Sequence, residues 1–301
     1  MANSEFSYVK NFEAPDSLPL SNWIVVRIDG RGFSKLCKKY NFVKPNDKRA
    51  INLMNSAAVQ VVKSFHDIVL GYGQSDEYSF VFHENTALFE RRSAKLSTSV
   101  ATMFTAEYVM QWRDFFPEEE MKLERPFPTF DGRCVCYPKK SILRDYLSWR
   151  QADCHINNLY NTTFWNLVLR GGEGEEEGKG MSGTEAEKML KGTFASDKNE
   201  ILWKRFGVNY NDEEEVFKKG SVVYRAYDDE EAENGANDDE DGGGSKKKAA
   251  ANPTSKTQLE KERKRKQKAR VVIEHTDIIG NAFWDKRPYI LVTKKKNVYD
   301  E

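Results

Sequence analysis

Two aspartates in similar surroundings are the residues with the clearest chemistry. Asp29 ends the apolar run WIVVRID and precedes Gly30, and Asp76 lies between the runs IVLGYGQ and EYSFVF, with Ser75 and Glu77 as its neighbours. Carboxylate oxygens are the ligands that Mg²⁺ prefers, and a magnesium site with open positions can hold a nucleotide triphosphate. Asp-Gly is also a common turn pair, and either aspartate alone is more often a turn residue than a ligand. The metal hypothesis therefore depends on the two meeting at one sheet edge.

The elements that must position these aspartates follow the order βαββαβ. Apolar alternation and short apolar runs predict strands at 24–28, 68–72, 78–82 and 133–137, and spacings of three and four predict helices from Asp47 onward and over 90–113. A right-handed crossover makes the first two strands parallel and leaves room for the third between them, running the opposite way. Asp29 and Asp76 then become neighbours. The predicted fold class is α+β, a ferredoxin-like palm with a helical C-terminal extension.

The turn after Asp29 is suited to phosphate. Gly30 and Gly32 let the backbone approach a ligand closely, and Gly30 can direct its carbonyl toward a metal. The amides of Arg31, Gly32, Phe33 and Ser34 precede a short predicted helix, where N–H groups and the helix dipole favour anions. Such a turn is weak evidence alone. Beside two carboxylates it predicts a nucleotide site.

Six basic residues are placed to meet a polyanion. Arg27, which we assign to the tRNA, lies on the first strand, Lys35 and Lys44 flank the following loop, and the first turns of the predicted second long helix contain Arg91, Arg92 and Lys95. Cations at a helix N-terminus oppose the helix dipole, so their placement is costly unless an anion meets them. We therefore predict that Arg92 and Lys95 contact phosphate, with a solvated helix face as the alternative reading.

Composition bounds the class of protein. The chain has 301 residues, 39% of them hydrophobic, which is enough for one elaborated domain or a domain with a small second lobe. No apolar run reaches 18 residues, so no membrane span is expected, and the first residues lack the layout of a secretory signal. The four cysteines include no C-x-x-C pair. Reduced, packed thiols in a cytoplasmic or nuclear protein are favoured over a zinc site.

The formal net charge of zero conceals two opposing runs. Residues 228–241 contain nine acidic side chains, and residues 242–270 contain eleven Lys or Arg against two Glu, so the sums of −9 and +9 cancel. Residues 228–268 have almost no apolar side chains and are predicted to be a disordered polyampholyte insert. A nuclear-import signal and a basic arm on nucleic acid are alternative interpretations of the basic run.

Five motifs in order identify a family. They are RIDGRGFSK, YGQSDEYSFVF, SWRQADCHINNLYNT (148–162), GTFASDKNEIL (192–202) and HTDIIGNAFW (275–284). Together they resemble tRNA(His) guanylyltransferases nearly end to end, outside the low-complexity stretches. The resemblance suggests a catalytic palm over 1–140, a helical tRNA-contacting region over 141–227 with an acidic linker at 171–180, the insert at 228–268, and a C-terminal strand and tail over 269–301.

The resemblance implies an enzyme that adds a guanosine to the 5′ end of tRNA(His), in the 3′-to-5′ direction. The family first adenylylates the tRNA 5′-phosphate with ATP, then uses the 3′-hydroxyl of GTP to displace AMP, and finally removes pyrophosphate. Each step is a displacement at phosphorus, which a site with two Mg²⁺ ions can serve. The partners implied are tRNA(His), ATP and GTP, no membrane, and three further copies of the chain in a homotetramer.

The family's functional positions carry over residue by residue. Asp29 and Asp76, with the Gly30 carbonyl, would hold both magnesium ions, and Glu77 would complete the catalytic set. The nucleotide would contact the turn 29–34, Ser75 and Asp76. Positions that match family contacts with tRNA are His155, Asn158, Asn161, Lys198 and Asn209. A polar HINN run of low helix propensity within a helix favours a functional surface over a packing face.

Two other functional classes remain open on the residues alone. A nucleotide cyclase with the same sheet would join a 3′-hydroxyl to an α-phosphate without needing the HINNLYN helix, and a non-catalytic RNA-binding module would not need the carboxylates. The chain also departs from the family pattern. The insert interrupts an expected hairpin of 222–227 with 271–274, and Ser34 stands where several relatives have His, so only a backbone role is expected there.

Overall fold

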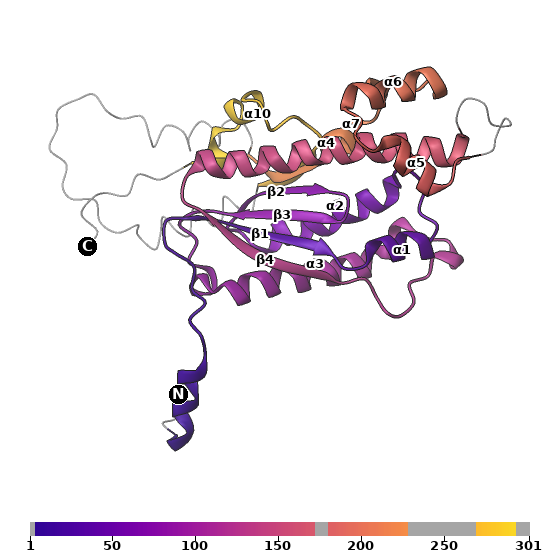
Figure 1. Ribbon diagram of the computed structural model, residues 1–301. Helices are drawn as coiled ribbons and strands as arrows, with labels where there is room; N and C mark the ends of the chain where they lie inside the picture. The colour runs from indigo at the N-terminus through magenta and orange to yellow at the C-terminus, as the bar shows by residue number, and fades with distance from the viewer. Residues whose placement is uncertain (1–3, 172–179, 228–268, 293–301) are drawn as a thin grey trace, which may run out of the picture.

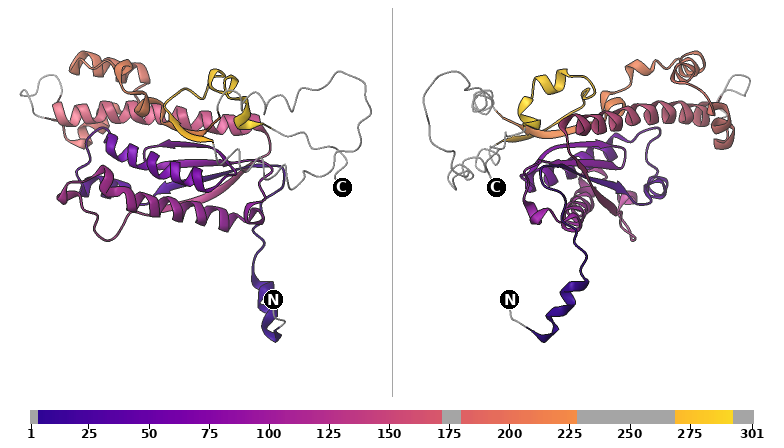
Figure 2. Two further views of the ribbon diagram at one scale, coloured as in Figure 1. Left: turned by 180° about the vertical axis from the view of Figure 1, so that it is seen from behind. Right: turned by 60° about the vertical axis from the view of Figure 1, so that its left-hand side comes forward.

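The computed structural model describes residues 4–171, 180–227 and 269–292 (Figure 1). The predicted insert at 228–268 and residues 172–179 of the predicted acidic linker lie outside the described residues. A short 3-10 helix, η1 (Glu5–Phe12), extends away from the body of the molecule in all views (Figures 1 and 2). Among the described residues, no helix is both long and apolar enough to cross a membrane.

A six-stranded antiparallel sheet forms the centre of the molecule, with the strand order β4-β1-β3-β2-β5-β6. The third strand lies between the first two and runs opposite to both, as the crossover argument predicts. The strands are β1 (Trp23–Gly30), β2 (Ile68–Gln74), β3 (Glu77–Phe82), β4 (Phe130–Tyr137), β5 (Ser221–Ala226) and β6 (Arg270–Glu274).

Helices cover both faces of this sheet (Figures 1 and 2). Two long helices, α2 and α3, pack on one face, and the longest helix, α4, lies across the other. The helices are α1 (Phe33–Lys39), α2 (Lys48–Ser64), α3 (Ser93–Phe115), α4 (Lys140–Arg170), α5 (Gly183–Leu190), α6 (Ala195–Phe206), α7 (Glu215–Lys219) and α10 (Ala282–Asp285), with 3-10 turns η2 (Leu88–Arg91), η3 (Glu119–Met121), η4 (Tyr210–Asp212) and η5 (Pro288–Leu291).

Alternation along β1 divides its side chains between two cores. Val26 and Ile28 point to the face covered by α2 and α3, where they are fully buried, and Val25 points to the face covered by α4. Arg27 and Asp29 are therefore on the α4 face. The alternation that buries the strand also decides that its last charged residues face α4.

Three sequence predictions need adjustment. The second long helix begins at Ser93 instead of residue 90, because Phe89, Glu90 and Arg91 have φ between 51° and 57°, which a right-handed helix does not allow. The fourth strand begins at Phe130, so Asp131 and Gly132 pair within the ladder and do not form a turn before it. The expected hairpin is confirmed as β5 with β6, and it extends the palm sheet, so 221–226 is strand within the region predicted to be helical.

Candidate active site

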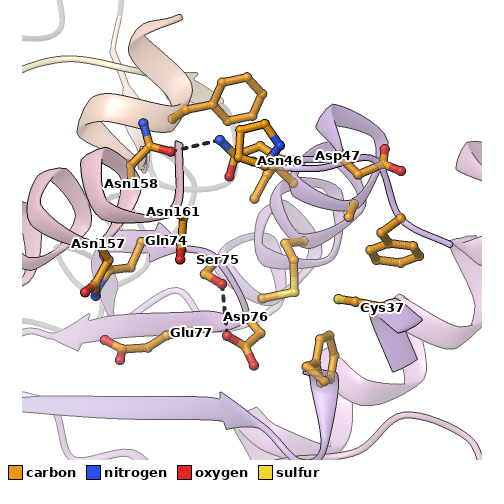
Figure 3. Close-up of a pocket in the computed structure, with 18 of the residues that line it drawn as sticks. Cys37, Asn46, Asp47, Gln74, Ser75, Asp76, Glu77, Asn157, Asn158 and Asn161 are labelled. Atoms are coloured by element: carbon orange, nitrogen blue, oxygen red, sulfur yellow. Dashed lines mark hydrogen bonds between the residues drawn. The ribbon is translucent and has the colours of Figure 1, made fainter. Parts of the chain in front are cut away.

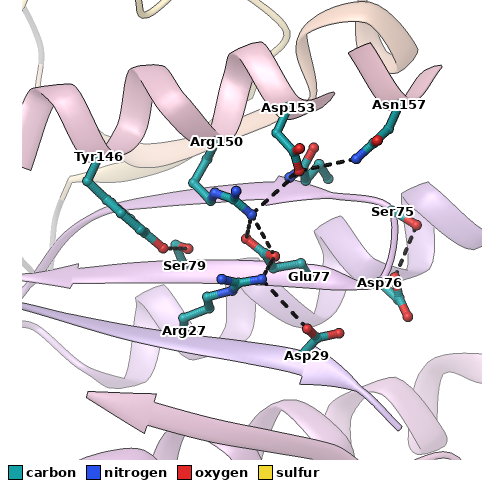
Figure 4. A network of polar contacts seen from close by, with 11 residues as sticks. Arg27, Asp29, Ser75, Asp76, Glu77, Ser79, Tyr146, Arg150, Asp153 and Asn157 are labelled. Carbon is teal, nitrogen blue, oxygen red and sulfur yellow. Dashed lines mark hydrogen bonds and ion pairs between the residues drawn. The ribbon is translucent and has the colours of Figure 1, made fainter. Parts of the chain in front are cut away.

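Asp29 and Asp76 meet at the edge where β1 ends and β3 begins (Figure 4). Asp29 is directly opposite Glu77 in the β1–β3 register, and the Gly30 amide donates to the Asp76 carbonyl oxygen at 3.0 Å. The two aspartates are thus held together by one ladder of hydrogen bonds although they are far apart in the chain. The geometry that the strand order predicts for them is confirmed.

The carboxylates at this edge repel one another. Burial raises the pKa of Asp76, and the charge of Asp29 raises it further, while Ser75 Oγ, which donates to Asp76 Oδ1 at 3.1 Å, lowers it. Burial also raises the pKa of Glu77, and the guanidinium groups of Arg27 and Arg150 oppose that rise. Clustered, partly desolvated oxygen donors with excess negative charge are the donor set that fits a hard divalent cation.

The turn that follows Asp29 is anchored by its apolar residue. The Phe33 side chain is buried against Phe130 and Tyr108, with ring centroids at 5.0 and 5.7 Å, so most of its ring packs in the core. Gly32 caps α1 with a φ of 70°, which favours glycine. The Arg31 amide already donates to the Thr129 carbonyl at 2.9 Å. The Arg31 amide is therefore not free to bind phosphate, contrary to the prediction for the amides of residues 31–34.

A cavity of about 1000 Å³ opens at this edge, between the β2–β3 turn, the loop 41–47 and α4 (Figure 3). Of the residues predicted to bind nucleotide or metal, Asp29, Phe33, Ser34, Lys44, Ser75 and Asp76 line it, with Glu77 and the predicted tRNA contacts Asn158 and Asn161. Lys44 reaches it from the loop, with Nζ 5.2 Å from the centre of the Trp165 ring. This volume is at the upper end of ordinary ligand pockets.

The sequence pattern did not single out several residues that line the cavity. They are Cys37, Asn46, Asp47, Gln74, Asp153, Asn157 and Trp165. Four cavity residues of α4, at positions 153, 157, 161 and 165, are spaced four apart and so share one face of the helix. That spacing is visible in the sequence and could have identified the set. The approach of loop 41–47 carries no such local signal.

The predicted phosphate contacts on α3 are not brought to this cavity. The described residues that line it include neither Arg92 nor Lys95. Arg92 pairs with Asp16, with Nε 3.0 Å from Oδ1, and its backbone lies next to Ser17. The N-terminus of α3 lies at the opposite end of β1 from Asp29 (Figure 1). Their expected place beside the carboxylates is wrong, because α3 runs along the sheet with its first turn at the far end.

The predicted tRNA contacts differ in their exposure. His155 is exposed on α4 and packs edge-on against Tyr210, with centroids 5.5 Å apart. Asn158 is only 6% exposed: it accepts from Asn46 Nδ2 at 2.8 Å and donates to the Tyr210 hydroxyl at 3.0 Å. Asn158 thus holds elements together instead of presenting a free surface, which corrects the surface reading of the HINN run at this position.

Two further predicted contacts also serve local structure. Lys198 Nζ donates to the Thr193 carbonyl at 2.9 Å and to its hydroxyl at 2.8 Å. The Asn209 side chain accepts from the Asn211 amide at 3.2 Å and caps η4. Their roles in tRNA binding stay predictions. Arg27 points toward the carboxylates, pairing with Glu77 and, at 3.7 Å, with Asp29.

Comparisons with known proteins agree on one family. The family model described as tRNAHis guanylyltransferase matches residues 6–138, and the model of the Thg1 C terminal domain matches residues 141–280. The tRNA(His) guanylyltransferase of Neurospora crassa is 54% identical, over 97% of this chain and 96% of that protein. The crystal structure of the Saccharomyces cerevisiae enzyme is 48% identical with a TM-score of 0.67, and covers 73% of this chain and 93% of its own. A bacterial Thg1-like protein in complex with ATP, 24% identical with a TM-score of 0.58 and covering 72% of this chain and 85% of its own, shares the fold.

Proposed function

The chain belongs to the tRNA(His) guanylyltransferase family, and from this premise we propose that it adds a guanosine to the 5′ end of tRNA(His). The observation that carries the proposal is the meeting of Asp29 and Asp76 at one edge of a cavity large enough for a nucleotide. Oxygen donors that repel one another, beside a Ser-lined turn and Lys44, suit a triphosphate bound with a divalent cation.

We propose three displacements at phosphorus in this cavity. The tRNA 5′-phosphate attacks the α-phosphorus of ATP and releases pyrophosphate, then the GTP 3′-hydroxyl attacks the adenylylated phosphorus and releases AMP, and hydrolysis last removes pyrophosphate from the new end. Asp29 and Asp76, with the Gly30 carbonyl, would hold two Mg²⁺ ions, which when bound lower the pKa of an attacking hydroxyl and neutralise phosphate charge.

The chain's own groups then have separate tasks. Lys44 and Ser75 bind and orient the triphosphate, and Ser34 contributes its backbone. Glu77 is saturated by Arg27 and Arg150, so its task is to orient its neighbours. His155, exposed on α4, would contact the tRNA, where Asn and His side chains and aromatic rings recognise unstacked bases.

Mapping the 5′ end of the RNA tests the proposal. The protein is incubated with tRNA(His) that lacks the extra guanosine, with ATP, GTP and Mg²⁺. One added 5′ guanosine, dependent on ATP, is expected. Cyclic nucleotide formed without RNA would instead support the cyclase alternative, and tRNA binding without any extension would support the binding module; either result would contradict the proposal.

The His155→Ala variant tests the assignment of α4 to tRNA. We expect the discrimination between tRNA(His) and another tRNA to fall, by about tenfold for a lost base contact, while direct binding of ATP and GTP is unchanged. An equal loss of affinity for tRNA(His), ATP and GTP would refute the assignment.

The homotetramer is also a proposal, and gel filtration with light scattering would test it.

A further inference from the structure

Five side chains of alternating charge form a ladder from α4 across the sheet to the end of β1 (Figure 4). In order they are Asp153, Arg150, Glu77, Arg27 and Asp29. Arg150 Nη1 is 3.6 Å from Asp153 Oδ2 and 3.2 Å from Glu77 Oε2. Arg27 Nη2 pairs with the same Glu77 oxygen and lies 3.7 Å from Asp29 Oδ2. Glu77, the one acidic group between the ends, therefore has an arginine on either side.

The centre of the ladder is the buried part. The Arg150 side chain is 5% exposed and that of Glu77 is 10% exposed, whereas Asp29 and Asp153 at the ends are 39% and 35% exposed. Ion pairs that are shielded from water are stronger and more rigid than surface pairs, provided that both partners are present. The Arg150–Glu77 pair is thus the fixed point from which the rest of the ladder extends.

The Trp149 ring, which forms an aromatic wall, packs against the Arg150 guanidinium. Its central carbon lies 3.5 Å from the centre of the Trp149 ring, so one flat face is covered while the edge pairs with Glu77. One turn earlier, the Tyr146 hydroxyl is 2.6 Å from Ser79 Oγ, and Ser79 is opposite Arg27 in the β1–β3 register. Helix α4 thus contacts two successive rows of the sheet beside the carboxylates.

Helix α4 also has contacts with the core, with α7 and with the segment after β6 that do not involve Arg150. The next residue, Gln151, donates to the carbonyls of Lys219 and Thr276 at 2.8 and 2.9 Å and accepts from the Ile278 amide at 2.8 Å. Leu143 and Leu147 add fully buried apolar contacts. The Arg150 guanidinium donates to Glu77 and thereby fixes a side chain beside Asp29.

We propose that Arg150 is a positioning residue for the reaction: it fixes Glu77, and Glu77 through Arg27 fixes the Asp29 carboxylate where a divalent cation is to be held. The effect of Arg150 on the reaction rests on the proposed function. Its effect on the position of Glu77 and Asp29 rests on the ladder contacts alone. Groups that orient metal ligands from behind commonly change metal affinity or activity by about 10- to 100-fold when removed.

Two substitutions separate charge from geometry. Arg150→Lys keeps a cation beside Glu77 but loses the fork and the stacking on Trp149, and Arg150→Met removes the cation. Arg144→Met is the matched control, because Arg144 is an arginine of the same helix that contacts Gly280, Asn281 and the Trp284 ring instead of the ladder. Trp149→Phe, at a position 56% exposed, perturbs only the wall.

Calorimetric titration of Mn²⁺ into the full-length protein saturated with GTP is the readout that does not depend on turnover. Arg150→Lys is expected to weaken Mn²⁺ binding and to lower kcat by about tenfold, and Arg150→Met by about 100-fold. The tRNA affinity should stay within about twofold, because neither variant changes the exposed surface of α4. Trp149→Phe should give a smaller loss in the same direction, and Arg144→Met none.

Wild-type Mn²⁺ affinity in Arg150→Lys and Trp149→Phe, or an equal loss in Arg144→Met, would overturn the proposal. If Arg150→Met does not fold, the lysine and Trp149 variants still decide it. The two proposals fail separately: a wild-type protein that does not extend tRNA contradicts the function, whereas unchanged Mn²⁺ binding in Arg150→Lys contradicts the ladder even if the wild type is active.

Discussion

Each end of β1 has an arginine near a turn with positive φ, but the charged groups at the two ends differ in their partners. At the start of the strand, Arg91 is 3% exposed and donates to five carbonyl oxygens, those of Leu18, Pro19, Asn22, Glu84 and Thr86. At the end of the strand, Asp29 raises the pKa of the already buried Asp76. Ser75, with a φ of 50°, forms the turn there.

This difference distinguishes a structural cluster from a functional one. The Arg91 cluster is complete within the chain, because a guanidinium has five N–H groups and all of its contacts are neutral acceptors. Among the described residues that line the cavity, five carboxylates outnumber two lysines: Asp29, Asp47, Asp76, Glu77 and Asp153 against Lys38 and Lys44. Arg27 and Arg150 pair with Glu77 beside the cavity. Unfavourable electrostatics that persist in a folded protein point to a ligand.

The largest effect should follow removal of either aspartate. Asp29→Ala and Asp76→Ala are each expected to lower the rate of 5′ extension by at least about 1000-fold, since each would remove a ligand of the proposed catalytic ions. Binding of tRNA, measured by filter retention, should remain near the wild-type value. Normal tRNA extension by either alanine variant would contradict a catalytic role for this end of the strand.

At the opposite end, Arg91→Met should affect stability instead of activity. The substitution leaves several buried carbonyls without a donor and is expected to cost about 3 kcal/mol in the free energy of unfolding, measured with urea. The matched control is Arg92→Met, because a surface pair such as that of Arg92 with Asp16 contributes little to stability. Activity per folded molecule should be unchanged in both; a large loss would place a functional role at this end.

Lysine at the cavity and arginine at the far end can be compared in direct nucleotide binding. Lys44→Ala removes a cation that lines the cavity, and GTP affinity should fall by about tenfold, or 1.4 kcal/mol. Arg92→Ala should change that affinity by less than about twofold. Fluorescence titration with a GTP analogue measures both, and the reverse order of effects would restore the sequence-based assignment of Arg92 to the nucleotide.

The smallest effect concerns the cost of ionising Asp76. Burial, with a smaller contribution from the charge of Asp29, raises the pKa of Asp76, so the ionised group destabilises the fold above that pKa and this penalty disappears as the pH falls through it. Asp76→Asn should therefore raise the melting temperature of the ligand-free protein at pH 7 by about 2 °C, with the gain vanishing at acidic pH. A lower melting temperature at pH 7 would contradict this cost of ionisation.

The sheet and its two aspartates were predictable because strand alternation, glycine turns and crossover handedness are all local or nearly local rules. The burial of Asn158 was not predictable, because it depends on contact with Tyr210, which lies 52 positions away in the sequence. The start of α3 was misplaced because three residues with positive φ, none of them glycine, carry no sequence signature. Arg150 was missed because an arginine on a helix is usually solvent-facing, and only the fold shows its contact with Glu77.

Counting bound Mn²⁺ by electron paramagnetic resonance, in the GTP-saturated protein, shows whether Asp29 and Asp76 form one metal site. If Asp29 and Asp76 hold the catalytic cations together, the wild type should bind about two ions, and Asp29→Ala and Asp76→Ala should each lose binding at concentrations that saturate the wild type. Wild-type occupancy in both alanine variants would contradict the claim that these two carboxylates form a metal site.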